Sequence, residues 1–162
     1  MADSSFDLVS DFDQQELVNA LDQVRREVAT RYDFKGAHVT LELTKTEIVL
    51  QADDEYRATA VKDLIQSKAV RRNLSLKIFD WGTVEPAGGG TVRQHIGLRR
   101  GLTSDQAKEL SKLVREQFPK VKPSIQGDAV RVSGKSRDEL QAVIGHLRGL
   151  DYPVALQFEN YR

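Results

Sequence analysis

Alternating apolar and polar residues predict the strands of this chain, and apolar residues three or four positions apart predict its helices. In the first half, an apolar stripe from Leu17 to Val28 has helical spacing, and Val39, Leu41 and Leu43 alternate with polar residues. Asp13 starts the first helix as its cap, with Glu16 as the reciprocal partner of a capping box. The pattern predicts helices over residues 13–32 and 54–72 and strands over residues 6–10, 39–43, 48–50 and 74–78.

The second half repeats this order. Thr103 with Gln106 and Ser136 with Glu139 predict two further capping boxes, and Gly127 is typical of a hairpin turn. The pattern predicts helices over residues 103–118 and 136–147 and strands over residues 91–99, around 125, 130–132 and 154–158. Between the halves, residues 82–90 carry one proline and three consecutive glycines, a composition that fits either a linker or a flexible hairpin loop.

The two halves are related by an internal repeat at a constant offset of 82 residues. Ile48 corresponds to Val130, and Leu50 corresponds to Val132. Each half has the order strand, helix, strand, strand, helix, strand, which is the order of a ferredoxin-like domain. We therefore predict an α+β fold with two tandem ferredoxin-like domains, each with two helices on one face of a four-stranded antiparallel sheet. A cleft between two such sheets is where we expect function.

Composition narrows the class of protein. The chain has no cysteine, so disulfides and thiolate metal sites are impossible. No apolar run is long enough to span a bilayer, and residues 1–10 lack a signal segment, so we expect a cytoplasmic protein without a membrane partner. Residues 1–81 carry 11 Lys and Arg against 15 Asp and Glu, whereas residues 82–162 carry 13 against 9. This asymmetry indicates either a basic lobe that binds anions or scattered solvated charge.

Candidate anion-binding groups cluster near two helix starts. Arg99 and Arg100 precede Gly101 and the helix that follows, an arrangement that favours phosphate, although a solvated basic turn is an equal alternative. Lys135 and Ser136 lie between a strand and a helix, as in a phosphate-binding loop, but Ala129 stands where that loop needs glycine. Ser136 therefore reads as a helix cap, while Lys135 can still assist anion binding.

The open sheet face is the other candidate. Strand parity directs Arg93, His95 and Arg99 outwards, with Arg131 on a neighbouring strand, so this face either holds a nucleotide or packs against the other domain. RNA-binding domains of this fold usually stack bases on aromatic residues of their central strands, and neither predicted central strand has one. In the first half only Phe79 and Trp81 form an aromatic pair with outward parity, and this weakens a prediction of stacked RNA.

The sequence contains no convincing enzyme signal. His38, His95 and His146 lie far apart and have no carboxylate at the spacing of metal ligands, so each reads as a surface residue. No nucleophile elbow or serine–histidine–acid grouping is present.

Several segments resemble the bacterial YajQ family. Residues 26–34 (REVATRYDF) and 125–141 (IQGDAVRVSGKSRDELQ) carry the resemblance, and residues 5–10 and 154–161 fit it too, so it spans nearly the whole chain. The family is described as nucleotide-binding, some members are cyclic di-GMP effectors that partner transcription regulators, and RNA binding has been proposed.

The resemblance also implies that the two domains exchange their N-terminal strands. One domain then comprises residues 1–12 with 102–162, and the other comprises residues 13–101. Residues 91–99 complete the first sheet, which moves Arg93, His95 and Arg99 to it. For residues 26–34 the resemblance favours a structural role over a ligand role: a helix end with packed aromatic side chains and an ion pair between Arg31 and Asp33.

We therefore predict a non-catalytic protein without a cofactor that binds a nucleotide, cyclic di-GMP or GTP, and acts with a transcription regulator. The first alternative is an RNA-binding protein or RNA-associated scaffold. The second, by analogy of fold alone, is an acylphosphatase-type enzyme that cradles phosphate with Arg99 or Arg100. The predicted nucleotide-binding residues are Arg93, His95, Arg99, Arg100, Arg131 and Lys135.

Overall fold

The computed structural model describes residues 3–162. The chain divides into two compact units, one formed by Phe12–Arg99 and the other by Met1–Asp11 together with Arg100–Arg162. Each unit has its own four-stranded sheet. Among the described residues, no helix combines the length and the apolar character that crossing a membrane requires.

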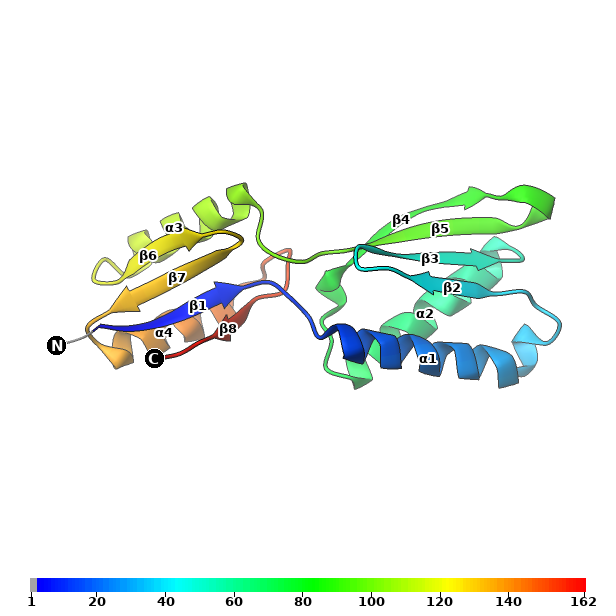
Figure 1. Ribbon diagram of the computed structural model, residues 1–162, viewed down its shortest axis with the longest axis horizontal. Helices are drawn as coiled ribbons and strands as arrows, with labels where there is room; N and C mark the ends of the chain where they lie inside the picture. The colour runs from blue at the N-terminus through cyan, green and yellow to red at the C-terminus, as the bar shows by residue number, and fades with distance from the viewer. Residues whose placement is uncertain (1–2) are drawn as a thin grey trace. The chain divides into compact units, whose positions relative to one another are not determined.

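The Phe12–Arg99 unit has a sheet with the strand order β2-β3-β5-β4, in which every neighbouring pair is antiparallel. Its two long helices lie on the same face of this sheet (Figure 1). The strands are β2 (Thr40–Leu43), β3 (Glu47–Ala52), β4 (Phe79–Pro86) and β5 (Val92–Leu98), and the helices are α1 (Gln14–Thr30) and α2 (Glu55–Arg71). Short 3-10 turns, η1 (Tyr32–Phe34), η2 (Leu76–Ile78) and η3 (Gly88–Gly90), connect them.

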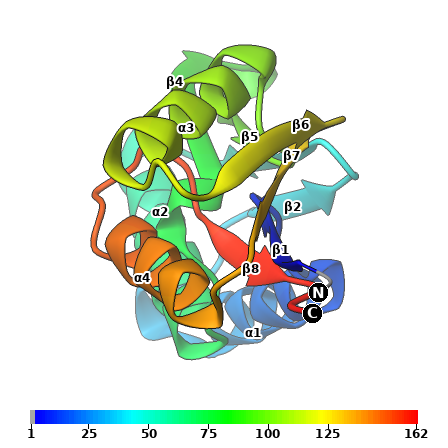
Figure 2. The same cartoon turned by 90° about the vertical axis from the view of Figure 1, so that its left-hand side faces the viewer.

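The second unit has a sheet with the order β6-β7-β1-β8, also antiparallel throughout. Its two helices cover one face of that sheet (Figure 2). The strands are β1 (Ser4–Val9), β6 (Lys122–Gln126), β7 (Ala129–Gly134) and β8 (Gln157–Glu159), and the helices are α3 (Ser104–Gln117) and α4 (Arg137–Arg148). Both units therefore have the predicted ferredoxin-like architecture.

The two units exchange their first strands, as the resemblance implied. β1, at the start of the chain, pairs with β7 and β8, and Leu8 faces both Val130 and Phe158. β5, from the middle of the chain, pairs with β3 and β4, and Ile48 faces Ile96. Each exchanged strand is central in its sheet, and Phe6 and Leu8 of β1 and Ile96 of β5 are buried in the cores.

The internal repeat is preserved in the strand register. Thr40 pairs with Gln51 in one sheet and Lys122 pairs with Ser133 in the other, at the same offset of 82. The helix that follows begins after Asp54 in one unit and after Ser136, its equivalent, in the other. Equivalent residues of the two units can therefore be compared directly.

The core of each unit lies between its helices and its sheet. In the unit that contains β1, Phe6 and Phe158 meet edge to face with ring centroids 5.8 Å apart. Burying one large apolar side chain of this kind contributes about 1.5–3 kcal/mol to stability. The fully buried large side chains of the two cores are Phe6, Leu8, Leu17, Leu21, Ile48, Leu50, Ile65, Ile78, Ile96, Leu110, Leu140 and Leu147.

The helix caps follow the sequence closely. Thr103 and Gln106 form the full capping box at α3. At α4 the Ser136 side chain accepts a hydrogen bond from the backbone N–H of Glu139, but among residues 3–162 the Glu139 carboxylate does not accept from Ser136, so this predicted box is only half formed. The Asp13 side chain caps α1, but the Glu16 carboxylate accepts hydrogen bonds from Asn19 and Arg72 rather than completing a box.

Two strand predictions need correction. Residues 74–78 do not form a strand, because Asn73 adopts a left-handed φ of 61° and the Ser75 side chain then starts η2. The fourth strand is β4 instead, and residues 82–90 form its end and the hairpin turn to β5, which is one of the two alternatives that their composition left open. The closing strand β8 is shorter than predicted, since Val154 is buried ahead of it in an irregular segment.

Candidate functional site

The cations predicted from the sequence are divided between the two units. Arg93, His95 and Arg99 lie in the Phe12–Arg99 unit, and the other three, Arg100, Arg131 and Lys135, lie in the second unit. Arg93 and His95 are exposed on the outer face of β5, as strand parity predicted.

Carboxylates accompany the cations of the Phe12–Arg99 unit. His95 Nδ1 lies 3.2 Å from a Glu47 carboxylate oxygen, and Arg93 faces Glu85 across the β4–β5 pair. The Arg99 guanidinium lies 3.6 Å from Asp80 and also donates to the backbone carbonyls of Lys77 and Phe79, both at 3.3 Å. This open face therefore has mixed charge, and a phosphate there would meet acidic groups as well as basic ones.

The two predicted arginines of the second unit, Arg100 and Arg131, are also paired. Arg131 donates to Asp7 at 2.9 and 3.4 Å, and Asn160 donates to the same carboxylate at 2.8 Å. The hydrogen bond from Arg131 is the largest cause that holds the pKa of Asp7 below its ordinary value of 3.8. Arg100 lies 3.0 Å from Asp11. Lys135 instead borders a cavity.

Phe79 and Trp81 do not point outwards, contrary to the prediction. Phe79 is buried, Trp81 faces buried Ile96 on β5, and the Lys62 ammonium of α2 lies 4.8 Å from the Trp81 ring centroid. The two rings therefore lie on the helix-covered face. The parity was misjudged because it was counted from a predicted strand over residues 74–78, whereas Ile78 ends η2 and the strand begins only at Phe79.

A cavity of about 740 Å³ lies elsewhere in the Phe12–Arg99 unit, where α1 ends and the chain turns towards β2. We call it the α1-end cavity. A volume of this size is within the range of small-molecule sites. Its lining comprises Arg25, Val28, Ala29, Thr30, Arg31, Tyr32, Phe34, Lys35, Gly36, Ala37, Val39, Thr40 and Leu41.

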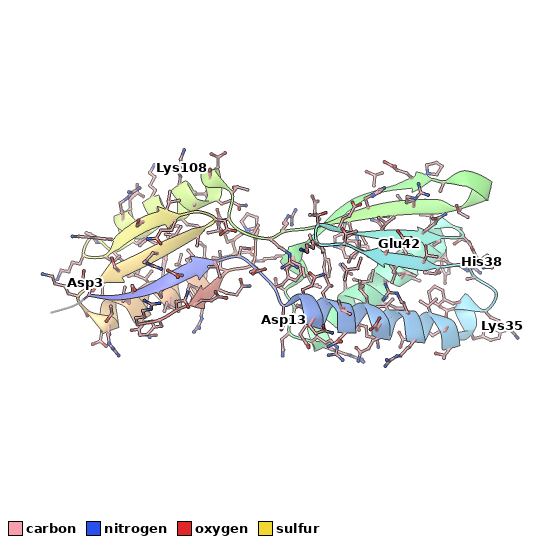
Figure 3. All side chains as sticks on the ribbon, viewed as in Figure 1. Asp3, Asp13, Lys35, His38, Glu42 and Lys108 are labelled. Atoms are coloured by element: carbon pink, nitrogen blue, oxygen red, sulfur yellow. The ribbon has the colours of Figure 1, made fainter. Side chains whose placement is uncertain are left out.

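The backbone that shapes this cavity follows from the local sequence. α1 ends at Thr30, and the extended conformation of Arg31 leads into η1. Gly36 then takes a φ of 77°, a left-handed conformation that glycine adopts without strain. Lys35 and His38 flank this turn, and Figure 3 shows them between the end of α1 and the start of β2.

The side chains of η1 are arranged around one fixed arginine. Arg31 forms a bidentate ion pair with Asp33, at 3.0 and 2.7 Å, and its guanidinium carbon lies 5.4 Å from the centroid of the Phe34 ring. Phe34 is only 3% exposed, whereas Tyr32 is 88% exposed. The cavity thus has a buried aromatic ring and a freely accessible one among its lining residues.

Cationic side chains and backbone carbonyl acceptors both border the cavity. Arg25 is fixed there by a 2.6 Å hydrogen bond to the carbonyl oxygen of Leu41 and a 2.9 Å ion pair with Asp22. Lys35 is exposed and has no ion pair among residues 3–162. The Glu27 carbonyl accepts hydrogen bonds from the N–H of Arg31 and the hydroxyl of Thr30. Within residues 3–162 the last three carbonyls of α1, at positions 28–30, have no donor, so they can accept hydrogen bonds from a bound molecule. The site offers aromatic surface, cations and acceptors, which are the groups that contact a base, a phosphate and a sugar.

Comparison with known proteins identifies the family. Residues 4–162 match the family model described as "Nucleotide-binding protein YajQ-like". The chain belongs to the YajQ family. It is 61% identical over 163 residues to a protein of Chloroflexus aurantiacus, with 99% of each chain covered. It is 60% identical to proteins of Chloroflexus aggregans, with 99% of this chain and 98% of the other covered, and of Synechococcus elongatus, with 98% of each covered. All three carry the name nucleotide-binding protein.

YajQ membership confirms the predicted resemblance, and the structure refines what residues 26–34 do. The ion pair between Arg31 and Asp33 is confirmed, but only one of the two aromatic side chains packs. The resemblance favoured a structural role for this motif, so no ligand site was predicted at the α1-end cavity. The sequence does contain a pattern that could have indicated this site: aromatic Tyr32 lies between the cations Arg31 and Lys35, just before Gly36.

Proposed function

We propose that this YajQ-family protein binds a nucleotide in the α1-end cavity and holds it without catalysing a reaction. The observation that carries the proposal is the exposure of Tyr32 beside a cavity of about 740 Å³. An accessible aromatic ring next to a hollow is a stacking surface for a base. Stacking of a base on an aromatic side chain is worth about 1–3 kcal/mol.

Charged groups support the same ligand class. Asp33 holds the Arg31 guanidinium in one orientation through two hydrogen bonds, so only the N–H groups on its other side are left to donate to a phosphate. Lys35, which has no ion pair among the described residues, supplies a mobile charge on the same loop. Carbonyl oxygens at the end of α1 suit the amino and imino groups of a base or the hydroxyls of a ribose.

For the ligand itself we propose a guanine nucleotide, cyclic di-GMP or GTP, with the complex acting on a transcription regulator. Guanine carries imino and amino donors that fit the carbonyl acceptors at the end of α1. Curated relatives named nucleotide-binding protein support the ligand class but name no particular nucleotide.

Calorimetric titration of the whole protein with cyclic di-GMP and with GTP tests this proposal. We expect saturable heat with at least one of them at micromolar to high micromolar ligand. Absence of heat with both, for a protein with a well-dispersed NMR spectrum, would remove the proposal.

The alternative site for the nucleotide is the open sheet face that carries the cations predicted from the sequence. Arg93 is the sharpest test of it, because this exposed residue has no ion pair among residues 3–162. If Arg93→Gln abolishes nucleotide binding and Tyr32→Ala leaves it intact, the ligand lies on the open sheet face. The reverse pattern supports the α1-end cavity.

RNA is the second candidate ligand, because the aromatic ring and the cations of the cavity suit a single strand as well as a free nucleotide. Binding led by phosphate contacts weakens steeply with salt. Filter retention of a single-stranded RNA at rising salt separates the candidates: tight retention that competes with GTP favours RNA, and no retention in low salt removes it.

A further inference from the structure

The internal repeat places different chemistry at equivalent positions of the two units. Because the sheets share one register at an offset of 82 residues, His38 corresponds to Lys120 and Asp53 corresponds to Lys135. Thr40, at the start of β2, corresponds to Lys122, at the start of β6. Three cations in one unit thus replace a histidine, a threonine and an aspartate in the other.

In the Phe12–Arg99 unit, the carboxylate of Asp53 fills the corner of the fold between the end of β3 and the loop that precedes β2. Both carboxylate oxygens of Asp53 accept hydrogen bonds from the backbone N–H of His38, at 3.1 and 3.0 Å. The contact links the end of β3 to the loop that leads into β2. A negative group therefore fits this corner of the fold and satisfies a backbone donor there.

In the other unit the position equivalent to Asp53 carries no carboxylate. Lys135 occupies the place of Asp53, and an ammonium group cannot accept a hydrogen bond. Within residues 3–162, the backbone N–H of Lys120, which corresponds to that of His38, has no hydrogen-bond acceptor. A cavity of about 390 Å³ lies at this corner. Asp3, Lys120, Lys122, Lys135, Ser136 and Glu139 supply its polar lining.

We propose that this second cavity, which we call the lysine cavity, binds a phosphate-bearing anion. An oxygen of the bound phosphate takes the place of the Asp53 carboxylate and accepts from the backbone N–H of Lys120. The ammonium groups of Lys122 and Lys135 neutralise the remaining charge. The cavity exceeds the volume of a single phosphate and accommodates a diphosphate. This site is separate from the α1-end cavity and does not depend on nucleotide binding there.

Two carboxylates limit the affinity. Asp3 and Glu139 border the same cavity, so three lysines are opposed by two acidic groups. The lysines are exposed, and their attraction for an anion is therefore screened by salt. We expect binding that is strongest at low ionic strength and that strengthens when one of the two carboxylates is neutralised.

The test is a titration of the full chain with pyrophosphate at low ionic strength, followed by amide NMR. We expect saturable shifts of the amide signals of Lys120, Lys122, Lys135 and Ser136. Lys135→Asp supplies the carboxylate that the other unit already has, so it should weaken pyrophosphate binding about tenfold or more, the equivalent of losing about 1.4 kcal/mol. Glu139→Gln should tighten binding several-fold.

Lys108→Asp is the matched control, because it makes the same change of charge on exposed α3. Figure 3 shows Lys108 well away from Asp3, which marks the cavity border. Unchanged affinity in Lys108→Asp with a large loss in Lys135→Asp supports the site. Equal affinity in Lys135→Asp and the wild type, or shifts confined to other amides, overturns it.

Tyr32→Ala leaves pyrophosphate binding unchanged if the two sites are separate. In that variant, shifts of the same four amides on adding GTP show that a nucleotide phosphate can also enter the lysine cavity, whereas shifts with pyrophosphate alone restrict it to free phosphates.

Discussion

The carboxylate of Asp7 accepts two hydrogen bonds from the guanidinium of Arg131, at 2.9 and 3.4 Å, across two paired strands whose residues lie 124 positions apart. Asp7 is on β1 and Arg131 on β7, so the pair joins the exchanged strand to the sheet that receives it. The Asp7 side chain is 14% exposed, whereas that of Arg131 is 43% exposed. The ion pair therefore stabilises the pairing of β1 with β7, and Arg131 could bind a phosphate only if this pair opened.

Asp7→Asn should lower the free energy of unfolding by up to about 1 kcal/mol at pH 7, since Arg131 is partly screened by solvent. The pKa of Asp7 is lowered in the folded protein, mainly by its hydrogen bond to Arg131. Its stabilising effect is therefore complete above the unfolded-state pKa, near 4, and is lost as the pH falls through the lower folded-state value. Urea unfolding from pH 7 to pH 2 should show the wild type and the variant converging in acid. A gap that persists at low pH would contradict this role.

Phe6→Ala should loosen the unit that receives β1 and leave the other unit intact. Phe6 is almost completely buried and contacts Phe158, so its truncation should cost about 3–5 kcal/mol. Ile96→Ala is the reciprocal control, because Ile96 lies on the exchanged strand β5 of the Phe12–Arg99 unit.

Hydrogen exchange measured by mass spectrometry reports the two effects separately. In Phe6→Ala we expect faster exchange in β7 and β8, and in Ile96→Ala faster exchange in β3 and β4. Faster exchange in the opposite unit for either variant would argue against the strand exchange.

Tyr152 should titrate well above an ordinary tyrosine. It is 6% exposed. Burial, followed by the charge of Glu109 and a hydrogen bond to it, raises its pKa to about 12. The folded protein thus keeps this proton more tightly than the unfolded chain does. Stability from Tyr152 is complete below pH 10 and falls by up to about 1.4 kcal/mol per pH unit as the pH rises towards 12.

Absorbance of the tyrosinate at rising pH checks this prediction. One of the four tyrosines should ionise near pH 12, and Tyr152→Phe should remove that step and flatten the alkaline loss of stability relative to the wild type. Four tyrosines that all ionise near pH 10 in the folded protein would contradict it.

The pattern of the sequence was sufficient to predict the layers of the fold but not the pairing of all strands. Alternation correctly placed residues 48–50 and 130–132, because one face of each strand is buried. Leu74, Leu76 and Ile78 alternate equally well, yet Leu76 is 39% exposed because the chain turns after Asn73. Periodicity does not say which sheet a strand joins, so only the resemblance to the family indicated that β1 and β5 are exchanged.

The candidate site was harder to predict, for a physical reason. Strand parity correctly exposed Arg93 and His95, but it could not reveal which carboxylates face them across a strand pair. Asp7 and Glu47 become neighbours of predicted cations only through the observed register. Tyr32 was missed because its exposure depends on a 3-10 turn after α1, and such a turn has no clear period.

The central claim is that a nucleotide base stacks on Tyr32 in the α1-end cavity, and Tyr32→Ala tests it most directly. Tyr56→Ala is the matched control, because Tyr56 is also largely exposed, at 73%, but lies on α2 outside the lining of that cavity. Titration calorimetry with cyclic di-GMP and GTP should show binding weakened roughly 5- to 150-fold in Tyr32→Ala, the equivalent of losing about 1–3 kcal/mol of stacking. Tyr32→Phe and Tyr56→Ala should bind like the wild type. Wild-type affinity in Tyr32→Ala would contradict the account.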